Sequence, residues 1–199
     1  MKNYAELLFT DSVRALQDEA GVGAKFEAVY RQRTRDSLSE EELGFIATRR
    51  SFYLASVSAD GWPYVQHRGG PRGFLKALGS NQLGFADYRG NRQFITMGHS
   101  ARHNRVALIL MDYENRERLK LLGRLTMIPI EDAEARVVAE LATEGEGKIE
   151  RIALLDVVAF DWNCQQFIPR LIEAERLEAA LAENERLRRR CGIPPTELV

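Results

Sequence analysis

The sequence predicts a mainly β (α+β) protein in which a closed antiparallel barrel is flanked by helices. Many short apolar and aromatic runs have the length of strands, and tight turn signals separate them. Few stretches have helical periodicity, and neither a GxGxxG motif nor an alternation of strands and helices occurs, so a Rossmann domain is not expected. The 199 residues, of which 45% are hydrophobic, suffice for the buried core of one domain.

Helices are expected ahead of the barrel. The first begins at Thr10 or Asp11, either of which can cap it, and the second covers residues 24–33. Ser39 and Glu42 have the spacing of a capping box and open a short helix that leads the chain into the barrel.

The runs with strand character share apolar, aromatic or alternating composition. They cover residues 51–58, 62–67, 83–86, 106–111, 119–128 and 149–162. Asp60-Gly61 is a hairpin turn between the first two runs, and Pro129 ends the fifth. One or two helical turns are expected within residues 93–104, and a longer helix over residues 130–143, where apolar side chains share one face.

The chain changes character after the last strand. Residues 172–192 are highly charged and predict a helix with Leu177, Leu181, Asn184 and Leu187 along one side. Two interpretations remain open. A solvated terminal helix packed on the barrel is favoured over a dimer-forming zipper, because the stretch is short for a coiled coil.

Composition limits the classes of partner. The formal net charge of −1 gives no basic field for nucleic acid, and no apolar run is long enough to cross a membrane. The N-terminus lacks the apolar core of a signal peptide, so a cytoplasmic location is expected. Cys164 and Cys191 are too far apart in sequence to suggest a metal pair or a disulfide scaffold, and His99 with His103 is expected to be a surface pair, so no metal is expected.

The stretch from Tyr64 to Arg92 has the strongest functional signal. Cations and glycines lie inside a strand-like run at residues 67–70, and a second polar cluster at residues 87–92 follows the next strand. A hairpin between the two runs would bring the clusters together. Glycine lets a ligand approach the backbone, and arginine offers a planar fork of donors to a phosphate or a carbonyl. The stretch indicates either a site for a flat anionic ligand or a basic hairpin that faces water.

Several motifs, in this order and spacing, carry a resemblance to a known family. They are Gly61 to Tyr64, Gly69 to Lys76, Phe85 to Arg92, Asn104 to Leu110, Arg118 to Gly123, and Asp161-Trp162 followed by Arg170. Over roughly residues 45–170 the chain resembles the pyridoxamine 5'-phosphate oxidase-like, FMN-binding split-barrel family. The resemblance implies a six-stranded antiparallel split β-barrel and one FMN-binding domain over residues 1–199. Its parts are N-terminal helices in residues 1–47, the barrel in residues 48–170 and a C-terminal helix in residues 171–192.

The resemblance also implies an FMN site. FMN needs cations for its phosphate, amide or backbone groups for the polar edge of its ring, and apolar surface for the ring faces. The candidate cofactor-binding residues are Gln66, His67, Arg68, Gly69, Asp87, Tyr88, Asn91, Arg92, Gln93, Trp162 and Gln165. Arg92 matches the basic pair that contacts the phosphate in the family. Trp162 matches a tryptophan near the flavin ring, usually supplied by the partner subunit, and Lys76 and Arg170 are further matches.

The activity implied is that of an FMN-dependent oxidoreductase acting on a small molecule or a pyridine nucleotide, within a homodimer that holds the cofactor at its interface. Oxidation of vitamin B6 phosphate is not expected, because Arg170-Leu171-Ile172 stands where the true oxidase has an Arg-x-His pair. No catalytic residue is assigned. His67 is the leading candidate for an acid or base, although a histidine that only hydrogen-bonds its surroundings is favoured. A non-catalytic flavin carrier or redox sensor, and a barrel that binds deazaflavin or haem, remain alternatives.

Overall fold

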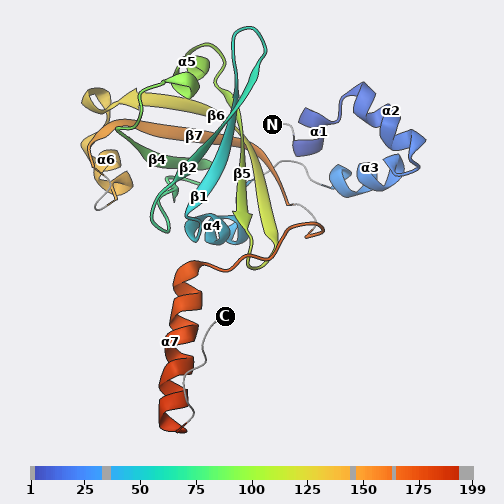
Figure 1. Ribbon diagram of the computed structural model, residues 1–199. Coiled ribbons are helices and arrows are strands. Elements are labelled where there is room, and N and C mark those ends of the chain that lie inside the picture. Colours follow the sequence, from blue (N-terminus) through green and yellow to red (C-terminus); the bar gives the residue numbers. More distant parts are fainter. Residues whose placement is uncertain (1–2, 33–36, 144–146, 163–164, 193–199) are drawn as a thin grey trace.

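The protein is built on one curved antiparallel sheet with the strand order β2-β1-β5-β6-β7-β4-β3, as the computed structural model shows (Figure 1). The structure describes residues 3–32, 37–143, 147–162 and 165–192. The strands are β1 (Ser51–Val57), β2 (Pro63–Gly69), β3 (Lys76–Ala77), β4 (Gln82–Tyr88), β5 (Arg105–Asp112), β6 (Glu117–Pro129) and β7 (Ile149–Trp162).

The sheet encloses the core because alternate residues of its long strands face inward. Burial alternates along β5, and the apolar residues of β6 follow the same two-residue period. Phe52 of β1 stacks on Phe74 at 5.5 Å and meets the edge of Phe85 of β4 at 5.4 Å, so side chains from opposite ends of the strand order share one core. The predicted antiparallel barrel is confirmed. It has one strand more than expected, the two-residue β3.

The predicted hairpin between the two polar clusters is wrong. β2 pairs with β1, whereas β4 pairs with β3 and β7, so β2 and β4 lie at opposite ends of the strand order. The two clusters nevertheless meet, because the sheet curls until Arg68 of β2 reaches Asp87 of β4. No backbone ladder joins β2 to β3 or β4, all of which are fully described, and the barrel is therefore split along this seam.

Helices α1 (Tyr4–Leu8), α2 (Asp11–Glu19) and α3 (Gly23–Arg31) form an arm beside the barrel, and α4 (Glu40–Ala47) lies across one barrel end (Figure 1). The Ser39 capping box is confirmed, since the Ser39 amide donates to Glu42 Oε2 at 2.8 Å. Sequence analysis missed α1, which Asn3 and Glu6 cap in the same way. The expected end of the second helix falls in residues 33–36, outside the described residues.

The helix predicted over residues 130–143 is present but shorter than expected. A 3₁₀ turn (Ile130–Asp132) is followed by α6 (Ala135–Leu141), and extended backbone at Ala133 and Glu134 separates the two. The break lets Leu141 pack over Gly84 of β4, where a Cβ atom would lie 2.9 Å from the leucine. The predicted turns within residues 93–104 are confirmed as α5 (Ile95–Arg102).

The C-terminal helix α7 (Ala174–Arg190) extends away from the barrel and does not pack on it (Figure 1). The favoured sequence interpretation was therefore wrong about its packing. Ion pairs hold its first turn, where Glu175 pairs with Arg50 at 2.9 Å and Glu173 pairs with Arg72 at 2.5 Å. Among the described residues, no helix is long and apolar enough to cross a bilayer.

Candidate functional site

A polar cavity of about 250 Å³ lies at the seam where β2 and β4 meet below α5. We call it the seam cavity. It brings together most of the predicted cofactor residues, namely Gln66, Arg68, Asp87, Tyr88, Asn91, Arg92 and Gln93. Its wall is completed by Tyr64, Gly90, Phe94, Ile95, Thr96, Met97, Met127 and Arg151. Residues from β2, β4, β6, β7 and α5 thus converge on one space.

Asp87 holds two arginines in this wall. Its Oδ1 accepts a hydrogen bond from Arg68 Nη1 at 2.7 Å, and its Oδ2 accepts one from Arg151 Nε at 2.8 Å. The carboxylate is buried, so these charge-assisted bonds fix both guanidinium groups. Arg68 Nε is buried and has no hydrogen-bond partner among the described residues. The wall therefore contains a cation with unused donor capacity.

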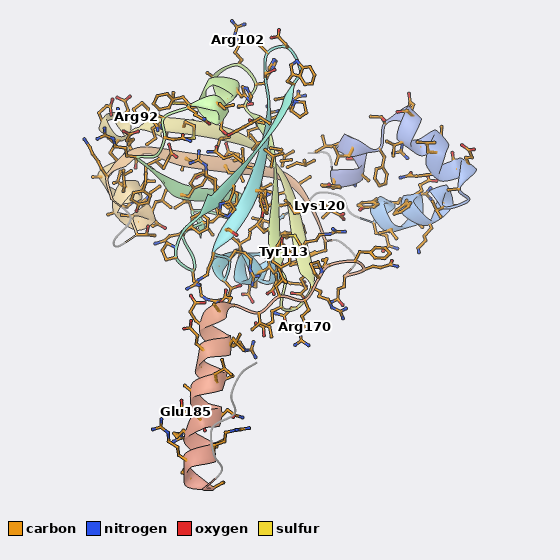
Figure 2. All side chains as sticks on the ribbon, viewed as in Figure 1. Arg92, Arg102, Tyr113, Lys120, Arg170 and Glu185 are labelled. Atoms are coloured by element: carbon orange, nitrogen blue, oxygen red, sulfur yellow. The ribbon has the colours of Figure 1, made fainter. Side chains whose placement is uncertain are left out.

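Arg92 lies beside α5, at the end of the barrel away from α7 (Figure 2). Its Nη2 donates to Glu150 Oε1 at 2.7 Å, and the hydrogen bond lowers the pKa of Glu150 below its ordinary value. A guanidinium has five N–H donors, so this contact leaves others for a ligand. The backbone of Arg92 has φ of 60°, in the left-handed region that non-glycine residues seldom adopt, and such strain clusters at functional sites.

The N-terminus of α5 opens on the seam cavity without a side-chain cap. Its N-cap residue, Phe94, also has a left-handed backbone, with φ of 54°. Ile95, Thr96 and Met97, the first residues of the helix, line the cavity wall. The first amides of a helix have no intrahelical partner and carry a partial positive charge, so such an end favours an anion.

Gln66 provides an amide group in the same wall. Thr96 is buried, and its hydroxyl lies 2.9 Å from Gln66 Oε1, to which it donates. This bond fixes the amide and leaves its nitrogen as a donor for a polar ligand edge. Apolar surface comes from Met127 and from Phe94, whose ring lies 5.2 Å from the Arg151 guanidinium carbon.

His67 and Gly69 line a neighbouring cavity of about 200 Å³ instead. Arg68 and Tyr88 line both cavities and form the partition between them. The Tyr88 hydroxyl is fully engaged with Thr143, because it lies 2.8 Å from the threonine hydroxyl and accepts from the threonine amide at 2.7 Å. Tyr88 therefore shapes the wall and offers no spare donor.

The structure separates Trp162 and Gln165 from the seam cavity within one chain. Trp162 ends β7, about 35 Å of strand away from Arg151 at about 3.3 Å per residue. Its Nε1 donates to Glu42 Oε1 at 2.7 Å, and its ring packs edge-on against Phe45 at 4.9 Å. Gln165 is exposed near the same end of the strand.

The two further matches also lie outside the seam cavity. Lys76 donates to the carbonyl oxygen of Glu140 at 2.6 Å and does not line the cavity wall. Arg170 is exposed near the start of α7 (Figure 2). Cys164, considered in the sequence analysis, lies outside the described residues, and Cys191 is exposed and free.

Sequence reasoning missed Arg151 and Thr96. Arg151 is a lone cation at the start of an apolar strand, and that position was a usable signal. No signal in the sequence identified Asp87 as its partner, because this contact depends on the register of β4 against β7. Thr96 carried no signal, since a threonine in a short helix is common.

An antiparallel barrel that is open along one seam, with a polar cavity at that seam, defines the split-barrel class. The chain belongs to the pyridoxamine 5'-phosphate oxidase family, whose family model matches residues 38–159. The matched segment runs from just before α4 to residue 159 within β7, and it excludes α1–α3, the last three residues of β7 and α7.

Solved structures agree with this fold. HupZ from Group A Streptococcus has a TM-score of 0.51 at 11% identity, over 68% of this chain and 99% of its own. A Lactobacillus delbrueckii protein, provisionally assigned as a pyridoxamine 5'-phosphate oxidase, has a TM-score of 0.50 at 21% identity, over 64% of this chain and 96% of its own. Comparison with curated proteins gives no match.

Proposed function

We propose that the chain is an FMN-binding flavoprotein that acts as an oxidoreductase on a small molecule or a pyridine nucleotide. The observation that carries the proposal is the seam cavity. It combines arginines, an uncapped helix N-terminus, a fixed amide and apolar side chains in one wall. These are the kinds of contact that a phosphorylated, flat, heterocyclic ligand requires.

The charges of the wall fit a phosphate. Arg68, Arg92 and Arg151 face the carboxylates of Asp87 and Glu150, so the local balance is positive. The phosphate is assigned to Arg92 and the α5 N-terminus, where backbone amides and a guanidinium act together. Arg92 can contact a bound phosphate and Glu150 together, because its bond to Glu150 uses one nitrogen and leaves other guanidinium donors for the phosphate.

The ring end of the ligand is assigned to the part of the wall formed by Gln66 and Arg68. Gln66 offers its amide nitrogen, and the unpartnered Arg68 Nε offers a further donor for a ring carbonyl or nitrogen. Bound FMN supplies the transfer of hydride or electrons. The residues of this chain bind it, orient it and limit the access of water. We assign no residue to proton transfer, because Tyr88 is fully engaged and His67 lies in the neighbouring cavity.

A homodimer with the cofactor at its interface is part of the proposal. A cavity of about 250 Å³ is smaller than the roughly 300–1,000 Å³ typical of ligand pockets. One chain thus provides part of a site, and a second copy covers the rest of the ring. Trp162 lies too far along β7 to reach the cavity of its own chain, so a role at the flavin requires the partner's cavity.

Substitution of Arg92 tests the cofactor assignment. Arg92→Ala is expected to weaken FMN binding about tenfold to a hundredfold, because it removes charge-assisted hydrogen bonds to the phosphate. The dissociation constant is measured by titration of flavin fluorescence. Arg89→Ala is the matched control, since Arg89 lies in the same loop but outside the cavity wall. Equal affinities for the two variants would refute the assignment.

Catalysis is tested separately on the loaded protein. The loss of visible flavin absorbance measures the reduction of bound FMN. Reduction by a nicotinamide nucleotide would support the oxidoreductase function. Bound FMN that no reductant reduces favours the carrier or sensor alternative. A protein that rejects FMN but takes up deazaflavin or haem in the same titration contradicts the cofactor assignment.

A further inference from the structure

Helix α7 presents an apolar stripe that the described residues of its own chain leave exposed. Leu177, Leu181 and Leu187 are exposed at 55%, 49% and 46%, although they recur at helical spacing. The helix runs for 17 residues, about 25 Å, and projects beyond the barrel (Figure 1). It lies outside the segment that the family model matches, so the barrel fold does not explain it.

The stripe has the heptad pattern of a coiled coil. With Leu177 at position a, Ala180 and Leu187 fall at d, and Asn184 falls at a; the C-cap residue Cys191 continues the a positions, and Leu181 falls at e, beside the seam. A single asparagine at an a position is the device that fixes register and the two-stranded state, because two facing asparagines can hydrogen-bond across the seam. The pattern therefore indicates a second, identical helix as the partner.

Charge decides the direction of that partner. Glu183 falls at g and Arg188 at e, so a parallel pair places each Glu183 opposite the Arg188 of the other helix. An antiparallel pair with the same core places Glu183 against Glu183 and Arg176 against Arg190, which repel each other. Within one chain Glu183 pairs with Arg186, so in the parallel pair the other helix's Arg188 shares or replaces this contact, whereas the outward pair Arg189–Glu185 stays within its helix.

The attachment of α7 suits a parallel pair. Arg50 and Arg72, together with the ion pair between Arg176 and Glu114, fix the first turn of the helix to the barrel. Both barrels of a parallel pair consequently lie at the same end, where they can contact each other around one two-fold axis. Pairing of the two α7 helices raises the effective concentration of one barrel near the other, and contact between the barrels does the same for the two helices.

We propose that α7 forms a parallel two-stranded coiled coil with α7 of a second copy of this chain. The partner is another copy because the core positions, the asparagine and the e–g charges are complementary to themselves. The proposal does not depend on FMN binding. Either proposal can fail while the other stands.

Disulfide cross-linking through Cys191 tests the proposal. In a Cys164→Ser background, a parallel pair brings the two Cys191 side chains together at an a position, within the reach of a disulfide. Mild oxidation of the full-length chain at micromolar concentration is expected to give a covalent dimer. Arg189→Cys, in a chain that also carries Cys164→Ser and Cys191→Ser, is the matched control. Its thiol lies on the outer face and is expected to cross-link about tenfold more slowly.

Removal of the leucines provides a second test. Leu177→Asp with Leu187→Asp is expected to abolish the Cys191 cross-link without unfolding the barrel, because both side chains are exposed. A retained circular dichroism spectrum and melting temperature confirm the fold. Equal cross-linking at positions 189 and 191, or no cross-link at Cys191 in the unsubstituted helix, would overturn the proposal. An antiparallel pair would also give no cross-link at Cys191, because it separates the two cysteines by about the length of the helix.

Discussion

At the scale of single residues, Asp87 has the greatest influence on the seam cavity. It is buried, and each of its two oxygens accepts from a different arginine, Arg68 on β2 and Arg151 on β7. Since no backbone ladder joins β2 to β4, the Arg68–Asp87 pair supplies a polar connection across the open seam.

We expect Asp87→Asn to lower the free energy of unfolding by about 2–3 kcal/mol, because it leaves the partly buried Arg68 without its counter-ion and leaves Arg151 with only its weaker contact to Glu150. It is also expected to weaken FMN binding, since Arg68 loses its fixed position. Urea unfolding measures the first effect. Asp156→Asn serves as the control, because Asp156 is exposed, and its effect should stay within about 0.5 kcal/mol. Equal losses in both variants contradict the assigned role.

The residues of the site that sequence analysis found share one property. Arg68 and Asp87 are charged positions inside strand-like runs, where an unpaired charge needs an explanation, and both lie in the seam cavity. Arg151 escaped notice because its partner is chosen by strand pairing across 64 residues of sequence. Trp162 came from family resemblance alone, and in its own chain it bonds Glu42.

At the scale of elements, β7 carries a bulge opposite β6, because Leu122 pairs with Ala159 and Gly123 pairs with Val157, which leaves Val158 as the extra residue. The register of β6 against β7 shifts between Leu122 and Gly123. A Cβ atom on Gly123 would lie 2.6 Å from Leu155 Cδ1 and 2.8 Å from the Asp156 carbonyl oxygen, closer than real contacts allow. The close approach of β7 thus requires glycine at this position.

We expect Gly123→Ala to destabilise the fold by about 1–3 kcal/mol through overpacking. Gly44→Ala is the control with the same chemical change. A Cβ at Gly44 meets no atom within 4 Å, and alanine there is expected to stabilise α4 by about 0.5–1 kcal/mol. Thermal unfolding of both variants measures the difference. A neutral or stabilising Gly123→Ala is the result that the bulge argument does not allow.

Helix α4 is linked to β7 through Glu42, and this link depends on pH. Burial by itself raises the pKa of Glu42, but hydrogen bonds from Ser39 and Trp162 outweigh it and hold the pKa below its ordinary value. A carboxyl with a lower pKa in the folded state adds stability that is complete above its unfolded pKa, near pH 4.3, and is lost as the pH falls through the folded pKa.

The melting temperature of the wild type is therefore expected to exceed that of Glu42→Gln at pH 7. The gap should narrow as the pH falls below about 4, where the wild-type carboxyl becomes protonated. A pH series of thermal melts on both proteins measures the gap. A gap that stays constant down to pH 3 means that the Glu42 carboxylate does not provide the link.

The elements that sequence analysis placed well are those set by local pattern. All strands except the two-residue β3 follow runs of apolar or alternating residues, and the cap of α4 follows from Ser39 and Glu42. The errors concern contacts that no local pattern encodes. The supposed hairpin between the two polar clusters depended on which strands pair, and the packing of α7 depended on whether the barrel offers a face to cover its leucines.

At the scale of the whole molecule, two features point to an assembly of two chains. The seam cavity is small for FMN, and α7 projects with an apolar stripe that no described residue of this chain covers. A parallel pairing of α7 places two barrels at one end, where a shared cofactor interface can form. The N-terminal arm is fixed independently, since the Tyr30 hydroxyl donates to Asp161 Oδ1 at 2.8 Å.

Native mass spectrometry of the full-length protein, loaded with FMN and then freed of excess, tests the central claim most directly. It reports the number of chains and the number of bound FMN molecules in the same particle. We expect two chains with two FMN molecules, and loss of the FMN mass but not of the dimer in Arg92→Ala. A wild-type protein that carries no FMN after loading would contradict the account, whatever its number of chains.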